Sequence, residues 1–204
     1  MRVIAGSLRG RRLSAPRGAE RTRPTSDRVR EAVFAMLGDP LDASVLDLFA
    51  GTGALGIEAL SRGASRALFV ECDRAALQAL RANLDALELG APRAQVRAGE
   101  ALAALRAARE RGETYDLVFL DPPYGHAREL EGPLSATLPA ILKPAARVVV
   151  ESDRRSPLAL ALQPLREKRY GDTLITIYSH QVLSDRDSAS KRARVAERGG
   201  EQSA

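Results

Sequence analysis

Apolar residues follow two different periods along the chain. Short runs bounded by turn residues are typical of buried strands, and they occur at residues 44–50, 66–71, 94–98, 115–121 and 146–152. Between these runs apolar residues recur at helical spacing. In residues 74–88 this spacing places four leucines on one helical face: Leu77, Leu80, Leu84 and Leu87. Strands that alternate with helices indicate a parallel βαβ sheet, so the pattern predicts an α/β domain.

The two ends of this alternating region carry their own signals. The segment TSDRVREAVFAMLG predicts an amphipathic helix that Thr25 or Ser26 caps and Gly38 ends. At the other end, residues 165–171 and 173–180 are separated by one short turn. Because that turn is too short for a crossover helix, we expect these two segments to pair as an antiparallel hairpin.

The chain divides into three regions. Residues 1–24 form a basic extension whose two short β-like pieces predict a small hairpin. Residues 25–180 form the α/β domain, in which residues 125–142 are less regular because one glycine and two prolines interrupt the helical spacing. Residues 181–204 are polar with almost no apolar content, so we expect a disordered tail.

Composition narrows the class of protein. Of the 204 residues, 45% are hydrophobic and 28% are charged, and no apolar run reaches the roughly 18 residues that cross a bilayer. The basic start of the chain lacks the apolar segment of a secretory signal. The single cysteine, Cys72, excludes an internal disulfide, and two distant histidines argue against a metal site. We expect a cytoplasmic, monomeric protein without a bound metal.

Positive charge is concentrated at the N-terminus. Residues 1–30 carry nine arginines against Glu20 and Asp27, a charge of +7, which leaves −2 for the rest of a chain whose net charge is +5. A basic extension on a near-neutral body is typical of nucleic-acid-binding proteins, although a solvated arm in an arginine-rich protein is the alternative. We expect its removal to weaken RNA binding and to spare cofactor binding. The candidate RNA-binding residues are Arg9, Arg11, Arg12, Arg23 and Arg28.

The segment DLFAGTGALG connects the first predicted strand to a helix. Gly51 and Gly53 allow a sharp turn and a close approach of a ligand to the main chain, with a helix N-terminus just beyond. Together with Gly56 they also match the dinucleotide-binding fingerprint. Glu71 ends the next strand, 20 residues after Gly51. An acid at this position can hold the ribose hydroxyls of a dinucleotide or of S-adenosylmethionine. A tight strand–helix turn beside a surface acid is the simpler alternative.

Asp47 distinguishes between a dinucleotide and S-adenosylmethionine as the cofactor. The pyrophosphate of a dinucleotide would be repelled by this carboxylate, whereas a ligand carrying an ammonium and a sulfonium would be attracted. S-adenosylmethionine has such an end and NAD does not. The site therefore favours the methyl donor.

The tetrapeptide Asp121-Pro122-Pro123-Tyr124 follows the fourth strand, so it should lie at the ligand-binding edge of the sheet. The lone pair of an exocyclic amine on a base is delocalised into the ring. Two acceptors on the amine, the Asp121 carboxylate and the Pro122 carbonyl, would direct that lone pair at the methyl group. Tyr124 offers a ring on which an extruded base can stack. These three residues are the candidate catalytic residues, and a simple strand stop is the alternative.

Four segments together resemble the bacterial 16S rRNA guanine-N2 methyltransferases of the RsmD family: RPTSDRVREAVF, DLFAGTGALGIEAL, FVECDR and DPPY. The resemblance covers residues 1 to about 180. It implies a class I S-adenosylmethionine-dependent methyltransferase fold of Rossmann-like type, with strand order 3-2-1-4-5-7-6. It also implies methylation of one guanine of 16S rRNA, in an assembled or partly assembled 30S subunit.

The same resemblance implies a cofactor site. It places the methionine moiety of S-adenosylmethionine among Asp47, Phe49, Gly51 and Gly53, with Asp121 nearby. The ribose would be held by Glu71, and the adenine would lie beside Cys72, Asp73, Glu100 and Ala101. Glu100 departs from the family pattern, in which a short Asn or Asp is commoner, and this puts its adenine contact in question. The segment from Arg23 to Arg28 would form part of the RNA surface.

Two other functions fit the same residues. The DPPY tetrapeptide also serves adenine-N6 methyltransferases of DNA or RNA. A non-catalytic RNA-binding assembly factor could keep the fold without the reaction. Intact Asp47, Asp121 and Tyr124 argue against that last alternative, because a binding module does not need all three.

Overall fold

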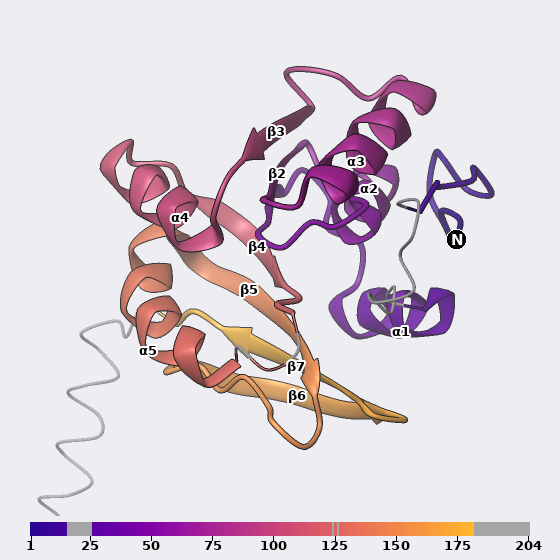
Figure 1. Ribbon diagram of the computed structural model, residues 1–204. Coiled ribbons are helices and arrows are strands. Elements are labelled where there is room, and N and C mark those ends of the chain that lie inside the picture. The colour runs from indigo at the N-terminus through magenta and orange to yellow at the C-terminus, as the bar shows by residue number, and fades with distance from the viewer. Residues whose placement is uncertain (16–25, 124, 126, 182–204) are drawn as a thin grey trace, which may run out of the picture.

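A seven-stranded sheet forms the centre of the protein, as the computed structural model shows for residues 1–15, 26–123, 125 and 127–181 (Figure 1). The strand order is β3-β2-β1-β4-β5-β7-β6, which confirms the order implied by the resemblance. Strands β1 to β5 are parallel, and β7 runs antiparallel to both β5 and β6. The strands are β1 (Ser44–Asp47), β2 (Arg66–Glu71), β3 (Ala94–Ala98), β4 (Tyr115–Leu120), β5 (Leu142–Asp153), β6 (Gln163–Tyr170) and β7 (Thr173–Ser179).

Helices cover both faces of the sheet, and each face has its own hydrophobic core (Figure 1). One face carries α1 (Asp27–Leu37), α2 (Ala54–Ser61) and α3 (Arg74–Ala86). The other carries α4 (Ala101–Glu110), α5 (Ala127–Thr137) and the short 3₁₀ helix η2 (Leu138–Ile141). The four leucines of the predicted α3 stripe are all at most 8% exposed. Among the described residues, no helix combines the length and apolar character that a bilayer crossing needs.

The helix ends follow the local sequence in α1 but not in α5. Ser26 caps α1 by accepting a hydrogen bond from the Val29 N–H at 3.3 Å, and Gly38 ends the helix with a φ of 78°, as predicted. In the segment expected to be less regular, α5 continues through Pro133, whereas the chain changes to the 3₁₀ helix η2 around Pro139. Leu134 on the buried face of α5 is fully inaccessible to solvent, so packing against the sheet outweighs the one backbone bond that Pro133 lacks.

The N-terminal segment, residues 1–15, is part of the folded domain. It turns back on itself through one isolated bridge between Arg2 and Arg12, rather than through two full strands. Val3 and Leu13 are 1% and 5% exposed and belong to the core shared by α1, α2 and α3. Figure 1 shows the segment, in indigo, beside α2 and α3. The structure thus contradicts the expectation of a separable arm, since removing these residues would also open the core.

Buried polar groups of α2 anchor this segment. Glu58 is fully buried, and its carboxylate accepts hydrogen bonds from the backbone N–H groups of Ile4 at 2.7 Å and Ala5 at 3.0 Å. Ser61 accepts a bond from the Leu8 N–H at 3.0 Å through its hydroxyl. Glu58 also pairs with Arg62 at 2.8 Å, so a deletion of the segment would remove its two backbone N–H donors and leave that ion pair.

Candidate active site at the carboxyl edge of the sheet

The loops that follow β1, β2 and β3 are joined by hydrogen bonds at the carboxyl edge of the sheet. The Ala50 N–H donates to the Val70 carbonyl at 2.9 Å, which links the first two loops. Glu71 continues this link: its Oε2 accepts from the Gly51 N–H at 2.7 Å, and its backbone carbonyl accepts from Gly99 at 2.9 Å. Ligands of open α/β sheets bind at such an edge.

The three loop glycines have different physical roles. Gly51 has a φ of 55°, and a Cβ placed there would meet no atom of the described residues within 4 Å, so a ligand can approach the loop from that side. Gly53 has a φ of 83° and begins α2. Gly56 lies inside α2, where a Cβ would meet the Phe69 ring at 2.3 Å. Gly56 is therefore required for close packing of helix on strand, while Gly51 shapes the ligand side.

Asp47 ends β1 and lies beneath the glycine loop. It is 2% exposed, and its Oδ2 accepts a hydrogen bond from the Gly56 N–H at 3.0 Å. Burial, aided by the nearby Glu71 carboxylate, raises the pKa of Asp47 to about 7, although the Gly56 bond opposes this shift. A buried carboxylate of this kind can be neutralised by a proton or by a cationic ligand group. Phe49, two residues on, is partly buried against the core on the α4 side.

Glu71, Cys72 and Asp73 form the corner between β2 and α3. Oε1 of Glu71 accepts hydrogen bonds from the backbone N–H groups of Cys72 and Asp73, both at 2.8 Å. Asp73 is the N-cap of α3, where its side chain accepts from the Ala76 N–H at 2.8 Å. Both carboxylates thus shape the corner. A carboxylate oxygen has further acceptor capacity, so these bonds leave Glu71 able to accept from hydroxyl groups as well.

Glu100 and Ala101 begin α4 beside this corner. Glu100 is the exposed N-cap of the helix and its side chain makes no capping bond, while Ala101 is buried in the core. Burial raises the pKa of the Cys72 thiol, and the charges of the nearby Glu100 and Glu71 carboxylates raise it further. The sequence-predicted adenine residues therefore lie together at one corner. Their contact with adenine stays a prediction.

Asp121 and Pro122 follow β4 directly, next to the glycine loop. The register pairs Asp47 of β1 with Phe119 of β4, and the Leu48 N–H donates to the Phe119 carbonyl at 3.1 Å. Asp121 is partly buried and Pro122 is buried. The structure brings the predicted catalytic acid and the predicted cofactor loop together. Tyr124, the third predicted catalytic residue, lies outside the described residues.

Glu151 is a carboxylate at this edge that the sequence analysis did not identify. It is 6% exposed near the end of β5. Leu120 of β4 pairs with Val150 of β5, so Asp121 and Glu151 are the next residues in the same register. The signal was present in the sequence, because Glu151 follows an apolar strand just as Asp121 does.

The predicted RNA-binding residues that the structure describes lie at the surface. Arg9, Arg11 and Arg12 are exposed on the N-terminal segment, and Arg28 is exposed on α1. Arg11 donates a hydrogen bond to the Ala86 carbonyl at the end of α3, so it also holds the segment in place. Arg23 lies outside the described residues.

Two buried polar side chains near the N-terminal segment were also missed by the sequence analysis. Arg30 of α1 is fully buried and donates to the Arg2 carbonyl at 2.6 Å and to Asp27 at 2.7 Å. Asn83 of α3 is 2% exposed and bonds to Ser14. Both occur in helical patterns where the sequence favours exposed polar residues, and both bond to the docked segment.

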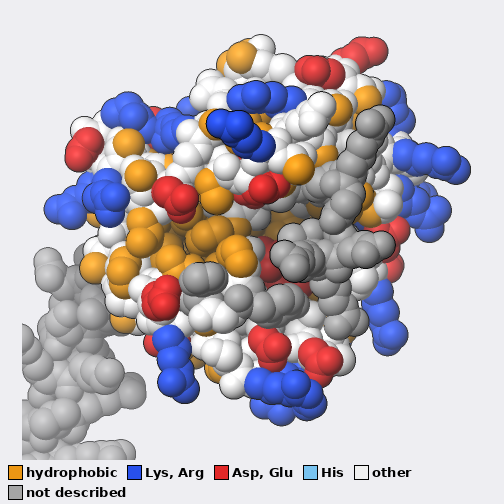
Figure 2. Space-filling view, in the orientation of Figure 1, with side chains coloured by type: hydrophobic (Ala, Val, Ile, Leu, Met, Phe, Trp, Pro, Cys, Tyr) orange, Lys and Arg blue, Asp and Glu red, His pale blue; other side chains and the backbone are white. Residues whose placement is uncertain are grey.

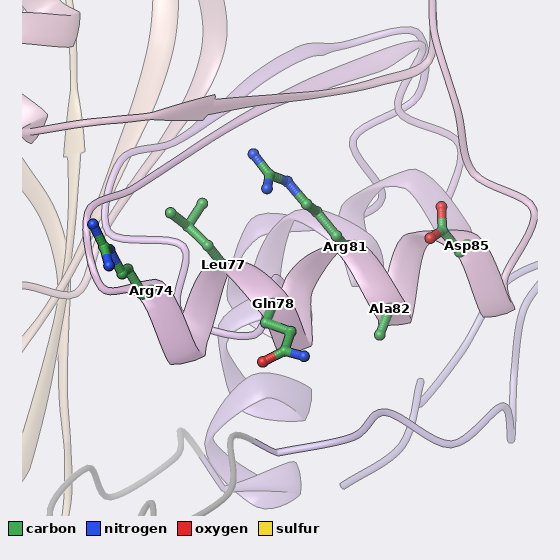
Figure 3. A pocket seen from close by; sticks show the side chains of 6 residues that line it. All are labelled: Arg74, Leu77, Gln78, Arg81, Ala82 and Asp85. Atoms are coloured by element: carbon green, nitrogen blue, oxygen red, sulfur yellow. The ribbon is translucent and has the colours of Figure 1, made fainter.

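The surface around the edge is chemically mixed. Figure 2 shows hydrophobic side chains in the middle of the visible face with acidic groups at their border, while Lys and Arg lie around the periphery. A separate hollow is lined by Arg74, Leu77, Gln78, Arg81, Ala82 and Asp85 (Figure 3). All six residues belong to α3, so this hollow is an indentation along one helix rather than a site where several loops converge.

Comparison with known proteins identifies relatives over most of the chain. The family model described as Conserved hypothetical protein 95 matches residues 1–179. YlbH of Bacillus subtilis (strain 168), named as a proposed rRNA methyltransferase, is 43% identical over 187 residues, covering 87% of this chain and 98% of that protein. Ribosomal RNA small subunit methyltransferase D of Escherichia coli (strain K12) is 37% identical over 197 residues, covering 92% and 94%.

Solved structures agree with this relationship. The Escherichia coli protein yhhF, described as a proposed methyltransferase, has 37% identity and a TM-score of 0.75, covering 89% of this chain and 98% of that one. A proposed S-adenosylmethionine-dependent methyltransferase from Streptococcus mutans shares the fold at 15% identity, with a TM-score of 0.64 over 75% of this chain and 48% of that one. The predicted class I methyltransferase fold is confirmed. The chain belongs to the Conserved hypothetical protein 95 family, the RsmD methyltransferase family that its motifs predict.

Proposed function

We propose that this protein transfers a methyl group from S-adenosylmethionine to the exocyclic N2 amine of one guanine in 16S rRNA of the small ribosomal subunit. The observation that carries this proposal is the placement of Asp121 and Pro122, which directly follow β4 beside the loop that holds Gly51 against Glu71. An acid for the target amine and a cradle for the donor thus lie at one edge. Membership of a family that includes ribosomal RNA small subunit methyltransferase D supports an rRNA substrate.

The residues at this edge fit S-adenosylmethionine. The open main chain at Gly51 suits a closely approaching ligand, and the buried Asp47 carboxylate suits a cationic neighbour. Glu71 would hold the ribose hydroxyls, with Cys72 and Glu100 beside the adenine. When bound, S-adenosylmethionine supplies an electrophilic methyl group: the nitrogen–methyl bond forms as the sulfur–methyl bond breaks, which leaves S-adenosylhomocysteine, and the methylated nitrogen releases one proton.

Asp121 and Pro122 would orient the amine. The Asp121 carboxylate accepts one N–H and the Pro122 carbonyl accepts the other, so that the nitrogen lone pair is directed at the methyl group. The carboxylate also stabilises the positive charge that develops on the nitrogen. Proline suits this position because its ring fixes the backbone and offers no N–H to compete for the base.

Methylation of 30S subunits tests the function directly. The substrate is 30S subunits from a strain that lacks the endogenous methyltransferase for this guanine. These subunits are incubated with the protein and radiolabelled S-adenosylmethionine, and the modified nucleoside is mapped. N2-methylguanosine in 16S rRNA supports the proposal. N6-methyladenosine would identify an adenine methyltransferase instead, and no product would identify a binding factor.

Glu151 gives a physical reason for preferring guanine. The Watson–Crick edge of guanine presents N–H donors at N1 and N2, which suit carboxylates, whereas adenine presents an acceptor at N1. With Asp121 and Glu151 in neighbouring register positions, the edge offers two carboxylates to these donors. Glu151→Gln should lower kcat/KM for 30S subunits by about tenfold, within the ~1–3 kcal/mol of a base-edge contact, without changing donor affinity. Glu167→Gln on the exposed strand β6 is the matched control, and equal activity of both variants would exclude this role.

The arginines of the N-terminal segment can be tested without deleting it. The side chains of Arg9 and Arg12 are exposed and bond to no other described residue, so Arg9→Ser/Arg12→Ser should leave the core intact. If both arginines contact phosphates, the negative slope of log K against log salt should become shallower by about 1.5 in this variant. The control is Arg106→Ser/Arg109→Ser on α4, which lies on the opposite face of the sheet from the N-terminal segment and should leave the slope unchanged. Titrations with rRNA fragments at several salt concentrations measure the slope, and an unchanged slope in the first variant would contradict phosphate contact.

A further inference from the structure

Asn83 joins two parts of the molecule that are far apart in the sequence. Its Oδ1 accepts a hydrogen bond from the Ser14 N–H at 2.7 Å. Its Nδ2 donates to the Ser14 carbonyl at 3.1 Å and to the Thr52 carbonyl at 3.0 Å. Both N–H donors of the amide are thus used, and the chemistry of the partners fixes which side-chain atom is oxygen. At 2% exposure, these bonds have no water to replace them readily.

Thr52 lies between the two glycines of the proposed donor loop. The carbonyl bound by Asn83 belongs to the peptide that joins Thr52 to Gly53, and the Gly53 N–H of that peptide donates to the Ala50 carbonyl at 2.7 Å. The peptide is therefore held at both ends. Gly51 directly precedes Thr52, so this orientation also determines where the open main chain of Gly51 lies.

Ser14 lies at the other end of the same bridge, in the N-terminal segment. The segment is also anchored on α2 by Glu58 and Ser61, and neither of these side chains bonds to the glycine loop. Within the described residues, side-chain hydrogen bonds link the segment to the loop through the Asn83 bridge and through a weak bond from the Thr52 hydroxyl to the Met1 sulfur at 3.7 Å. The α2 anchors provide neither link. This difference allows docking of the segment to be separated from positioning of the loop.

We propose that Asn83 is a positioning residue that transmits the docking of the N-terminal segment to the donor loop, and so holds that loop in its S-adenosylmethionine-binding geometry. The proposal rests on the proposed function, which assigns the donor to this loop. It accounts for the burial of an asparagine on a helix whose other buried side chains are Ala and Leu. An apolar residue at this position could not bind both backbones and would leave the Ser14 and Thr52 groups without these partners.

Asn83→Asp keeps the size and the acceptor but removes both donors and sets a charge against two carbonyls. We expect S-adenosylmethionine to bind at least tenfold more weakly, measured by calorimetry, with kcat at saturating donor within about twofold of the wild-type value. Ser14→Pro removes the N–H that Oδ1 accepts without altering α3, so it should also weaken donor binding several-fold. Ser14→Ala keeps both backbone groups and should bind the donor like the wild type.

Ser61→Ala is the control for a purely structural role. It removes hydroxyl bonds to Leu8 and Ala5, but Glu58 and the buried Val3 and Leu13 still dock the segment and the Asn83 bridge is intact. The variant should therefore lower the free energy of unfolding without changing donor affinity. Urea unfolding of every variant measures the stability loss. The proposal is overturned if folded Asn83→Asp and Ser14→Pro keep wild-type affinity, or if Ser61→Ala weakens donor binding equally. A wild-type protein that binds no donor would instead refute the proposed function.

Discussion

Replacing Asp121 by alanine should lower kcat for methylation of 30S subunits by about 10²–10³-fold, with little change in S-adenosylmethionine affinity. The reason is that this acceptor acts mainly in the transition state, where the amine nitrogen gains positive character. Such a loss corresponds to roughly 3–4 kcal/mol of transition-state stabilisation. Donor affinity should persist because most contacts assigned to the donor come from the loops after β1, β2 and β3, which hydrogen bonds of Ala50, Gly51 and Gly99 join.

Asp121→Asn separates hydrogen bonding from charge at the same position. The amide oxygen can still accept from the substrate amine, but it carries no charge to balance the nitrogen, so the loss should be smaller than in the alanine variant. Tyr124→Ala should behave differently and weaken productive base capture, because it removes a stacking surface. Single-turnover methylation with saturating 30S subunits, beside donor titrations, distinguishes these effects. Near-wild-type turnover of Asp121→Ala would show that DPPY is not the catalytic corner.

The sequence predicted the sheet and the position of the candidate site well, because both depend on local patterns. Apolar runs gave strands β2 and β3 with their observed bounds, and the leucine stripe of α3 is buried as expected. Acids and glycines after such runs must lie at one edge once the strands are parallel. For this reason Asp47, Gly51, Glu71 and Asp121 could be placed together without knowledge of the packing.

Contacts between distant segments could not be predicted in the same way. Polar residues such as Glu58 and Asn83 occur in helical patterns, where exposure is the usual expectation. Their burial depends on residues 1–15 folding back over α2 and α3, and the arginines of that segment predicted a basic, nucleic-acid-binding extension rather than part of the core. The apolar residues Val3 and Leu13 held the missing signal, since both are buried in the core. Two apolar positions in a basic stretch are too few to form a periodic pattern.

Asp47 should make the stability of the protein depend on pH. Its pKa is raised from 3.8 to about 7 in the folded protein, chiefly by burial, so the folded state binds a proton that the unfolded chain releases above pH 4. The stabilisation from this proton is complete below the unfolded pKa and is lost as the pH rises through the folded pKa. The free energy of unfolding should therefore fall by on the order of 4 kcal/mol between about pH 4 and pH 7 through this group alone.

Asp47→Asn isolates this effect, because the amide oxygen can still accept from Gly56 but the side chain never ionises. The variant and the wild type should be similarly stable near pH 4, and the variant should be the more stable at pH 8 in urea unfolding. Its affinity for S-adenosylmethionine should nevertheless fall, because the carboxylate is expected to balance the charge of the donor. In the wild type, donor binding near pH 7 should release protons, detected by calorimetry in buffers of different ionisation enthalpy, and the variant should release none. A stability difference that does not change with pH would show that Asp47 is ionised in the folded protein throughout this range.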